Sequence, residues 1–325
     1  MRALRFHRHG PPADVLQLDD VPTPEPGPGE VRLRLTHRPV HPSDLSMVKG
    51  TYGHSRELPA VGGNEGAGVV DAVGDGVSLA VGQRAVKLGE APTWQQAVVL
   101  PEADVLPVPD ALADHAAAQL FVNPLTAWLL HRDAGLAPSD VLVQTAGASA
   151  VARIAAEMAV ARGAHAVAVV RSDDQRGRLE ALGATVVVAD ANTPEARAAL
   201  REAVGEGGAA AVFDPVAGDA GALALSSLRD GGRHVVYGAL SGEPLPVPPA
   251  ALIYRDVTVS GVWRTQWASR VDRAVLRDAL SGLAVAAAEG VFTLPVDATF
   301  DLADGAEAVR QSTAHGRWGK VLLTG

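Results

Sequence analysis

The distribution of apolar and polar side chains changes twice along the chain. In the first third, residues 30–40 alternate polar and apolar positions with a period of two, as a half-buried strand does. Short apolar runs cut by glycines follow at residues 65–77 and 82–89. Many short strands separated by glycine turns predict a barrel-like β domain.

The middle of the chain alternates strand-like and helix-like segments. A helical pattern begins near residue 110, breaks at Asn123–Pro124 and ends near Gly135. Apolar runs that predict buried strands then occupy residues 140–147, 165–172, 184–190, 209–216, 233–239 and 256–263. Amphipathic helices are predicted between the first five of these strands, at residues 148–163, 173–183, 193–207 and 219–232. This alternation is typical of a doubly wound parallel sheet. The proline-rich residues 240–254 predict an extended loop.

The last part returns to a mixed pattern, with helices predicted at residues 270–290 and 305–316 and strands at 294–304 and 319–325. The α/β sheet is therefore expected to be inserted between two parts of a β-rich domain. The predicted limits are 1–122 for the first part of the β-rich domain, 123–262 for the nucleotide-binding domain and 263–325 for the return.

Composition narrows the class of protein. The chain has 325 residues, enough for two domains, and its net charge of −9 argues against nucleic acid or an anionic membrane as partner. It contains no cysteine, which excludes disulfides, thiolate catalysis and thiolate zinc sites. The N-terminus lacks the apolar run of a signal peptide, and no apolar stretch reaches about 18 residues. A cytoplasmic location is expected.

The first turn of the middle domain resembles a dinucleotide-binding turn. Such turns use small residues so that backbone N–H groups approach a pyrophosphate at a helix N-terminus. Gly147 takes the first glycine position, Ser149 the second and Ala152 the third. The residues expected to hold the pyrophosphate are Gly147, Ala148, Ser149, Ala150 and Val151. An ordinary strand-to-helix turn is the alternative interpretation.

The end of the second strand of the middle domain indicates which cofactor binds. An acidic residue there would bond the ribose hydroxyls of NAD. The chain has instead Arg171 and Ser172, followed by Arg176. A guanidinium and a hydroxyl suit a ribose 2′-phosphate, so NADPH is the expected cofactor. Alternatively, these residues form the solvated, charged start of a helix and bind no ligand, since Asp173 and Asp174 are also present.

A metal site is considered because His41, Asp44, Asn64 and Glu65 could form a cluster. A catalytic zinc usually takes Cys, His and carboxylate ligands. Here asparagine stands where a second strong ligand is wanted, so no metal is expected.

Four stretches carry a resemblance to a known family. They are residues 41–53 joined to 57–70, with their tyrosine and glycine turn, the Asn-Pro-Leu-Thr-Ala-Trp run at 123–128, the nucleotide turn, and residues 252–267. Over nearly its full length the chain resembles the medium-chain dehydrogenase/reductase superfamily, most closely the zinc-free 2-enoyl thioester reductases of the mitochondrial type. The resemblance implies a Rossmann domain inserted in a GroES-like domain. The chain departs from the pattern at His41, at Ala152 and in residues 54–60.

The resemblance also implies roles for single residues. Tyr52 matches the tyrosine regarded as catalytic, and a phenol O–H can stabilise an enolate and supply its proton. The other residues implied are Asn123, Thr126, Tyr237 and Gly238 at the cofactor, and His41, Asn64, Trp263 and Trp267 at the substrate. Some of these residues also have a structural alternative. Tyr52 could be a partly exposed loop residue, Asn123 could cap a helix, and the two tryptophans could pack in the core. Glu65 is expected to be structural.

The predicted function is therefore NADPH-dependent reduction of the activated C=C bond of a small-molecule trans-2-enoyl thioester, carried by coenzyme A or acyl carrier protein. A quinone or enone (2-alkenal) oxidoreductase on the same scaffold is the alternative. A protein that binds NADPH without catalysis is a third hypothesis, supported only by Ala152. The apolar strand at residues 256–263 is expected to lie at a sheet edge, where two copies would pair as a homodimer.

Overall fold

The computed structural model describes residues 1–89 and 91–325 and divides into two compact units. Unit 1 comprises Met1–Val122, Ala268–Gly290 and Leu294–Gly325. Unit 2 comprises Asn123–Trp267 and Val291–Thr293. The chain therefore leaves unit 1 at Val122 and returns to it at Ala268, five residues after the predicted position.

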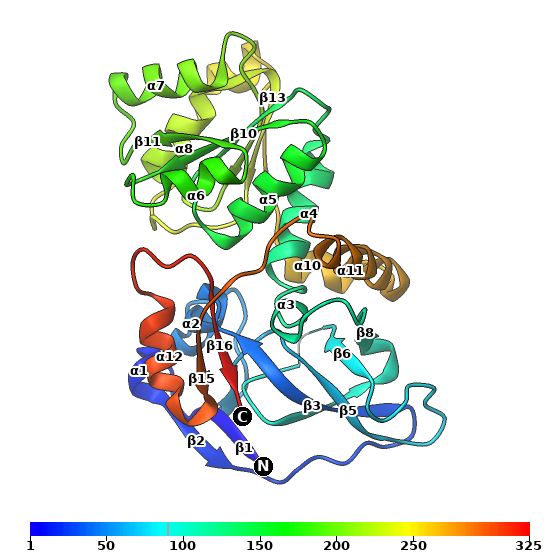
Figure 1. The fold of residues 1–325 in the computed structure, drawn as a ribbon. Coiled ribbons are helices and arrows are strands. Elements are labelled where there is room, and N and C mark those ends of the chain that lie inside the picture. The colour runs from blue at the N-terminus through cyan, green and yellow to red at the C-terminus, as the bar shows by residue number, and fades with distance from the viewer. Residues whose placement is uncertain (90) are drawn as a thin grey trace. The chain divides into compact units, whose positions relative to one another are not determined.

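Unit 1 is rich in short strands (Figure 1). Its strands are β1 (Arg2–Phe6), β2 (Leu16–Asp20), β3 (Glu30–Pro39), β4 (Ala60–Val61), β5 (Ala67–Val73), β6 (Arg84–Lys87), β7 (Ala97–Pro101), β8 (Val105–Pro107), β15 (Val296–Asp301) and β16 (Lys320–Thr324). Its helices are α1 (Pro12–Val15), α2 (Pro42–Lys49), α3 (Asp114–Ala117), α11 (Arg273–Ala288), α12 (Gly305–Ser312) and the 3₁₀ turns Glu102–Asp104 and Leu302–Asp304.

The strands of unit 1 form two sheets. One has the order β2-β1-β4, and the other has the order β15-β16-β3-β5-β6-β8, with β7 also paired to β3. The alternating residues of β3 explain its central place, because Val31, Leu33 and Leu35 enter one hydrophobic core. β16 pairs with β3, so segments on both sides of unit 2 in the chain complete one sheet.

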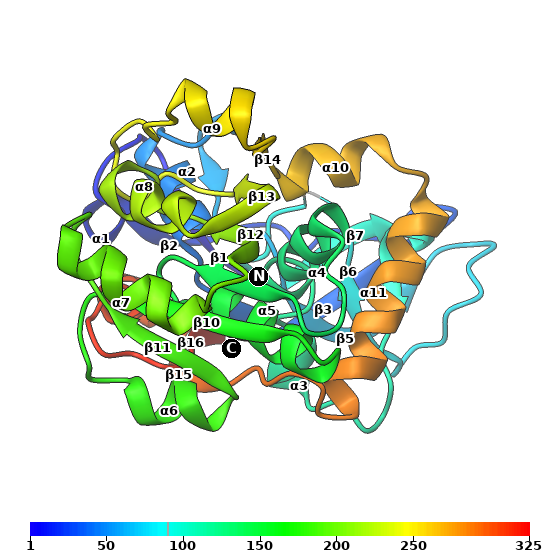
Figure 2. The same ribbon diagram turned by 90° about the horizontal axis from the view of Figure 1, so that it is seen from above.

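Unit 2 alternates strands and helices (Figures 1 and 2). Its strands are β9 (Val141–Gln144), β10 (His165–Val170), β11 (Ala184–Val188), β12 (Ala209–Asp214), β13 (Leu228–Val236) and β14 (Thr258–Gly261). Its helices are α4 (Asn123–Ala134), α5 (Ala150–Ala161), α6 (Arg176–Ala181), α7 (Pro194–Val204), α8 (Gly218–Ser226) and α9 (Pro249–Tyr254), and α10 (Arg264–Arg270) follows.

The six strands of unit 2 are parallel, in the order β11-β10-β9-β12-β13-β14. All residues of β12 are buried, as expected for a parallel sheet covered on both faces. Leu200 of α7, Leu223 of α8 and Ala251 of α9 pack in one core with the strands. The predicted class, a doubly wound α/β sheet inserted in a β-rich domain, is confirmed.

Two local predictions were wrong, and a third segment had no predicted helix or strand. Residues 249–254, expected as extended loop, form helix α9, which begins with Pro249 at its first position, where no backbone N–H is needed. β13 begins at Leu228, inside a segment expected to be helix. Residues 264–270 form helix α10. In the part of the chain that the structure describes, no helix is long and apolar enough to cross a membrane.

Candidate active site

Tyr52 lies in an irregular loop, residues 51–59, between helix α2 and strand β4. The loop follows Gly50, which ends α2 in the left-handed conformation with φ of 77°. The Tyr52 ring is half-buried and meets the His54 ring edge to face, with the centroids 5.1 Å apart. Among the described residues, Tyr52 belongs neither to the hydrophobic core cluster that contains Phe6 and Trp94 nor to the one that contains Val31 and Val70, so its ring does not fill either of these cores.

A glycine turn after the Tyr52 loop holds Asn64 and Glu65. Gly62 and Gly63 lie against the fully buried indole of Trp94, where a Cβ on either glycine would overlap the ring. The backbone of Gly62 accepts hydrogen bonds from Thr93 N and Trp94 N at 3.1 and 2.9 Å. This close packing fixes the turn, because neither residue tolerates a side chain.

Four polar side chains form a buried polar cluster: His41, Asp44, Asn64 and Glu65, each at most 3% exposed. His41 Nε2 lies 2.5 Å from Glu65 Oε1, and Asn64 Nδ2 donates to Asp44 Oδ1 at 2.6 Å. Asp44 also accepts a bond from the backbone N–H of His41, which is the N-cap of α2, so Asp44 is the third helical residue of a capping box. Glu65 Oε2 accepts from Val122 N at 2.7 Å.

Charges in the buried polar cluster offset one another. Burial raises the pKa of Asp44, and the nearby charges of His41 and Arg56 oppose that rise. The sequence predicted that His41 and Asn64 line a substrate pocket. The structure brings them together, but it places both side chains inside a hydrogen-bonded network that also contains Asp44 and Glu65.

The buried polar cluster does not fit a zinc ion. His41 Nε2 already bonds Glu65, the Asn64 amide bonds Asp44 and Arg56, and the chain has no cysteine. Among residues 1–89 and 91–325, no three His, Asp or Glu side chains are grouped as a metal ion requires.

In unit 2, the turn between β9 and α5 has the features of a nucleotide-binding turn. Gly147 approaches β10 so closely that a Cβ would lie 2.6 Å from Ala168 Cβ. Ser149 caps α5 by accepting a bond from Ala152 N at 3.4 Å. Ala146 has a positive φ of 47°, which is unusual for a residue other than glycine. Ala148, Ala150 and Val151 are half-buried, so the start of the helix stays accessible.

Ala152, in the third glycine position, is fully buried in α5. A methyl group therefore fits where the pattern usually has glycine. Tyr237 and Gly238 directly follow β13, and the Tyr237 N–H bonds Asp214 O at 3.0 Å. Burial of its hydroxyl raises the pKa of Tyr237, and the neighbouring Ser149 hydroxyl opposes this effect.

The end of β10 presents one arginine that is available for a ligand. Arg171 is exposed and makes no hydrogen bond or ion pair within the described residues. The Ser172 hydroxyl donates to Asp174 at 2.8 Å. Arg176 differs from Arg171, because its guanidinium bonds Asp173 at 2.5 Å and Glu180 at 3.3 Å. A phosphate beside β10 would therefore meet Arg171 without first breaking an ion pair.

The four other predicted site residues of unit 2 have different surroundings. Asn123 is the first residue of α4; its side chain is buried, and its Nδ2 finds no partner among the described residues. Thr126 is buried one turn later. Trp267 packs 5.6 Å from Trp128, whereas Trp263 is 41% exposed.

A network around Asp214 was missed by the sequence analysis. Its fully buried carboxylate accepts bonds from the Thr145 hydroxyl at 2.5 Å and from His234 Nε2 at 2.9 Å. It also accepts from the N–H groups of Val216 and Ala217. Burial would raise the pKa of Asp214, but these bonds hold it below its usual range. The sequence did contain one sign of this network, since Asp214 is a charged residue at the end of the otherwise apolar strand β12.

The network joins the turns that follow two neighbouring strands, β9 and β12. Ala217 has a positive φ of 62°, so its backbone is strained, and the Asp214 carboxylate holds its N–H. Ligands of doubly wound sheets bind at the carboxyl ends of the strands. The Asp214 network therefore fixes the turns at the carboxyl ends of β9 and β12, on the same side of the sheet as the nucleotide turn.

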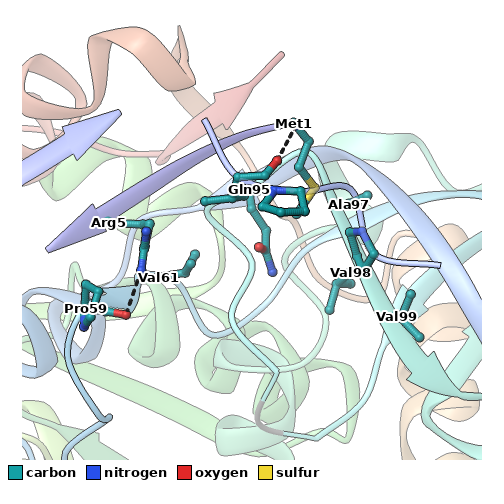
Figure 3. Close-up of a pocket in the computed structure, with 11 residues that line it drawn as sticks. Met1, Arg5, Pro59, Val61, Gln95, Ala97, Val98 and Val99 are labelled. Atoms are coloured by element: carbon teal, nitrogen blue, oxygen red, sulfur yellow. Dashed lines mark hydrogen bonds between the residues drawn. The ribbon is translucent and has the colours of Figure 1, made fainter. Parts of the chain in front are cut away.

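A separate pocket of about 530 Å³ lies in unit 1 (Figure 3). It is lined mainly by Met1 and by apolar residues of β7 and the segments 21–24 and 59–61. Arg5 is its one charged side chain, and it bonds Asp19 and Pro59 O. The pocket contains none of the predicted site residues and offers no group for acid–base chemistry.

The two units define a class of protein. A doubly wound sheet with a glycine turn and a capped helix N-terminus is typical of a dinucleotide-binding domain, and the β-rich unit 1 contains the irregular Tyr52 loop and the buried polar cluster. Such a chain is an NAD(P)H-dependent oxidoreductase. Comparison with known proteins supports this class: residues 27–110 match the family described as alcohol dehydrogenase GroES-like domain, and residues 150–281 match the zinc-binding dehydrogenase family.

The enoyl-[acyl-carrier-protein] reductase, mitochondrial, of Xenopus tropicalis is 35% identical over 285 residues, which are 82% of this chain and 78% of the relative. A mycobacterial quinone oxidoreductase and a mycobacterial protein complexed with NADPH each match with TM-score 0.88 and 27% identity, over 100% of both chains. The mitochondrial 2-enoyl thioester reductase Etr1p/Etr2p heterodimer of Candida tropicalis matches with TM-score 0.88 and 25% identity, over 100% of this chain and 99% of that one.

The chain belongs to the medium-chain dehydrogenase/reductase superfamily, in the group that contains the mitochondrial enoyl-[acyl-carrier-protein] reductases. The predicted family is thereby confirmed. The cytoplasmic location stays a prediction, because the names of these relatives place them in mitochondria.

Proposed function

We propose that this protein reduces the C=C bond of a trans-2-enoyl thioester with NADPH, the acyl group being carried by coenzyme A or acyl carrier protein. The observation that carries the proposal is Tyr52, a half-buried tyrosine outside the hydrophobic cores, on a loop next to a tightly packed glycine turn. Relatives that are named enoyl reductases support the same substrate class.

NADPH, when bound, supplies the hydride that adds to the β-carbon of the substrate. The electrons of the C=C bond then move to the thioester carbonyl oxygen as an enolate. The Tyr52 hydroxyl donates a hydrogen bond to that oxygen and gives its proton to the α-carbon, and solvent returns a proton to the phenolate. The products are a saturated acyl thioester and NADP⁺.

The residues of unit 2 would hold the cofactor. The N–H groups at the start of α5, from Ala148 to Val151, face outward from a helix N-terminus and suit the pyrophosphate. The unpartnered Nδ2 of Asn123 and the residues Thr126, Tyr237 and Gly238 are assigned to the rest of the dinucleotide. Arg171 and Ser172 would bind the ribose 2′-phosphate, which makes NADPH the preferred form.

The quinone or enone oxidoreductase is the second candidate, favoured by the mycobacterial quinone oxidoreductase among the structures of similar fold. Reduction of a quinone needs no positioned acid at a carbon atom, so this activity would not depend on Tyr52. The third candidate, NADPH binding without catalysis, predicts that no substrate of either class is reduced.

We also assign a homodimer to this chain. β14 is an edge strand of the parallel sheet, and helix α9 before it exposes Leu252, Ile253 and Tyr254 by 45%, 69% and 81%. An unpaired edge beside exposed apolar side chains favours association with a second copy.

A screen of NADPH oxidation tests the function. Crotonyl and longer enoyl thioesters are compared with quinones and simple enones, using wild-type protein and Tyr52→Phe. The proposal requires that thioesters are the best substrates and that Tyr52→Phe loses most of this activity. Faster turnover of quinones, equal in both proteins, would favour the second candidate.

A further inference from the structure

The loop that carries Tyr52 also carries Arg56, whose guanidinium reaches the glycine turn. Arg56 Nη1 donates to Val61 O at 2.6 Å. Arg56 Nη2 donates to Gly63 O and to Asn64 Oδ1, each at 3.1 Å. One side chain thus connects the irregular loop to three acceptors on the segment that follows it.

The glycine turn is a firm anchor for this connection. Gly62 and Gly63 lie against Trp94 and have no room to move toward it. Asn64, which accepts from Arg56, donates in turn to Asp44 in the first turn of α2. α2 leads directly into the Tyr52 loop, so a single chain of hydrogen bonds joins the two ends of that loop.

The charge of Arg56 suits its surroundings. Asp44 and Glu65 place two carboxyl groups in the buried polar cluster, and His41 faces only Glu65 with its Nε2. A guanidinium at the rim of this cluster is favoured by the buried carboxyl of Asp44. Its planar fork reaches two carbonyls and an amide oxygen at once, which a lysine ammonium cannot reproduce with the same geometry.

We propose that Arg56 is a positioning residue, which holds the loop in the conformation that presents the Tyr52 hydroxyl to the enolate oxygen. The inference rests on the proposed role of Tyr52. The backbone from residue 51 to residue 59 has no helix or strand, so no regular backbone ladder fixes this segment and side-chain bonds such as those of Arg56 hold it. Arg56 stands four residues after Tyr52, in the part of the loop that departs from the family pattern.

The kinetic test is a double-mutant cycle with Tyr52→Phe, Arg56→Ala and the double variant. Arg56→Ala should lower kcat on enoyl thioesters at least about tenfold, because displacement of a catalytic group by about 1 Å has effects of this size. In the Tyr52→Phe background the same change should have an effect below about twofold, because no hydroxyl remains to be positioned. Arg56→Lys should fall between wild type and Arg56→Ala.

Arg84→Ala is the matched control. Arg84 is another arginine of unit 1 that clamps a loop, through Asp114 and the carbonyls of Pro109, Asp110 and Leu112. Its removal should leave kcat within about twofold of wild type, and any effect should be the same with and without the Tyr52 hydroxyl. NADPH affinity, measured by direct titration, should stay unchanged in all variants, since the cofactor residues belong to unit 2.

A second measurement needs no substrate. The chain has only three tyrosines, so protein labelled with 3-fluorotyrosine has three fluorine resonances, and Tyr52→Phe identifies that of Tyr52. Arg56→Ala should shift or broaden the Tyr52 resonance and leave those of Tyr237 and Tyr254 in place. An unmoved Tyr52 resonance, a wild-type kcat for Arg56→Ala, or equal effects of Arg56→Ala in both backgrounds would each overturn the inference while leaving the role of Tyr52 intact. Full activity of Tyr52→Phe would instead overturn the proposed function together with the inference.

Discussion

Replacement of Arg171 by alanine tests how this protein selects its cofactor. Arg171 follows β10, is exposed, and has no partner within the described residues. It can therefore turn toward a ribose 2′-phosphate without giving up an existing bond. NADH lacks that phosphate, so the variant should lose affinity for NADPH and keep its affinity for NADH.

The expected magnitude follows from the exposure of the site. A hydrogen bond to a charged group contributes about 1.5–3 kcal/mol when it is shielded from water, whereas an exposed ion pair contributes about 0–1 kcal/mol. The phosphate carries nearly two charges, which moves the value above that of a simple exposed pair. Asp173 and Asp174 act in the opposite direction, although Arg176 already neutralises Asp173. We therefore expect about 1.4 kcal/mol, a tenfold preference for NADPH.

The assay is a fluorescence titration of NADPH and NADH into the wild-type protein and two variants. The ratio of the two Kd values should be at least about ten in the wild type and close to one in Arg171→Ala. Arg201→Ala is the control, because Arg201 is an exposed arginine in the last turn of α7 and does not belong to the end of β10, so its removal should leave the ratio unchanged. Higher salt should narrow the ratio, since the contact is exposed.

Two results would refute this reasoning. Equal Kd values for NADPH and NADH in the wild type would show that the protein has no site for the 2′-phosphate. A ratio that survives in Arg171→Ala but falls in Arg176→Ala would move the site to Arg176, and would mean that its ion pairs with Asp173 and Glu180 open when the cofactor binds.

Three further predictions concern catalysis, metal and assembly. Tyr52→Phe should lower kcat on enoyl thioesters by about 10²–10³, as expected for a lost oxyanion donor, while quinone reduction stays near wild type. Exhaustive chelation should leave activity unchanged, and stoichiometric zinc in elemental analysis of active protein would contradict this. Sedimentation at micromolar concentration should give a dimer for the wild type and a monomer for Tyr254→Asp, which places a charge on the most exposed apolar residue of α9; a wild-type monomer would refute the assembly.

The sequence predicts the parallel sheet well because its central strands are buried on both faces. Residues 166–170 and 209–213 are continuous apolar runs in which every residue is buried, and such runs have few other structures available to them. The proline-rich segment before β14 misled the prediction, since Pro249 is compatible both with a loop and with the first position of a helix.

The candidate site was predictable only in part. Single residues such as Tyr52, Gly147 and Arg171 were found from their local patterns. Interactions between distant residues were not, because residue identity gives no partner. The bond of His41 to Glu65 spans 24 positions, and that of Asp214 to Thr145 spans 69. Nor does the sequence distinguish Arg171 from Arg176, although only the second is held in ion pairs.

The pairing of β16 with β3 has a consequence for the order in which the protein takes shape on the ribosome. Domains usually fold in the order in which they are synthesised. Here β3 leaves the exit tunnel early, but its neighbour β16 is made only after all of unit 2. Unit 2 is nearly continuous in sequence and can complete its sheet first. The nascent chain must therefore keep the β3 edge from pairing wrongly until β16 emerges, and chaperone binding to stalled chains is expected to end when residues 320–324 are released.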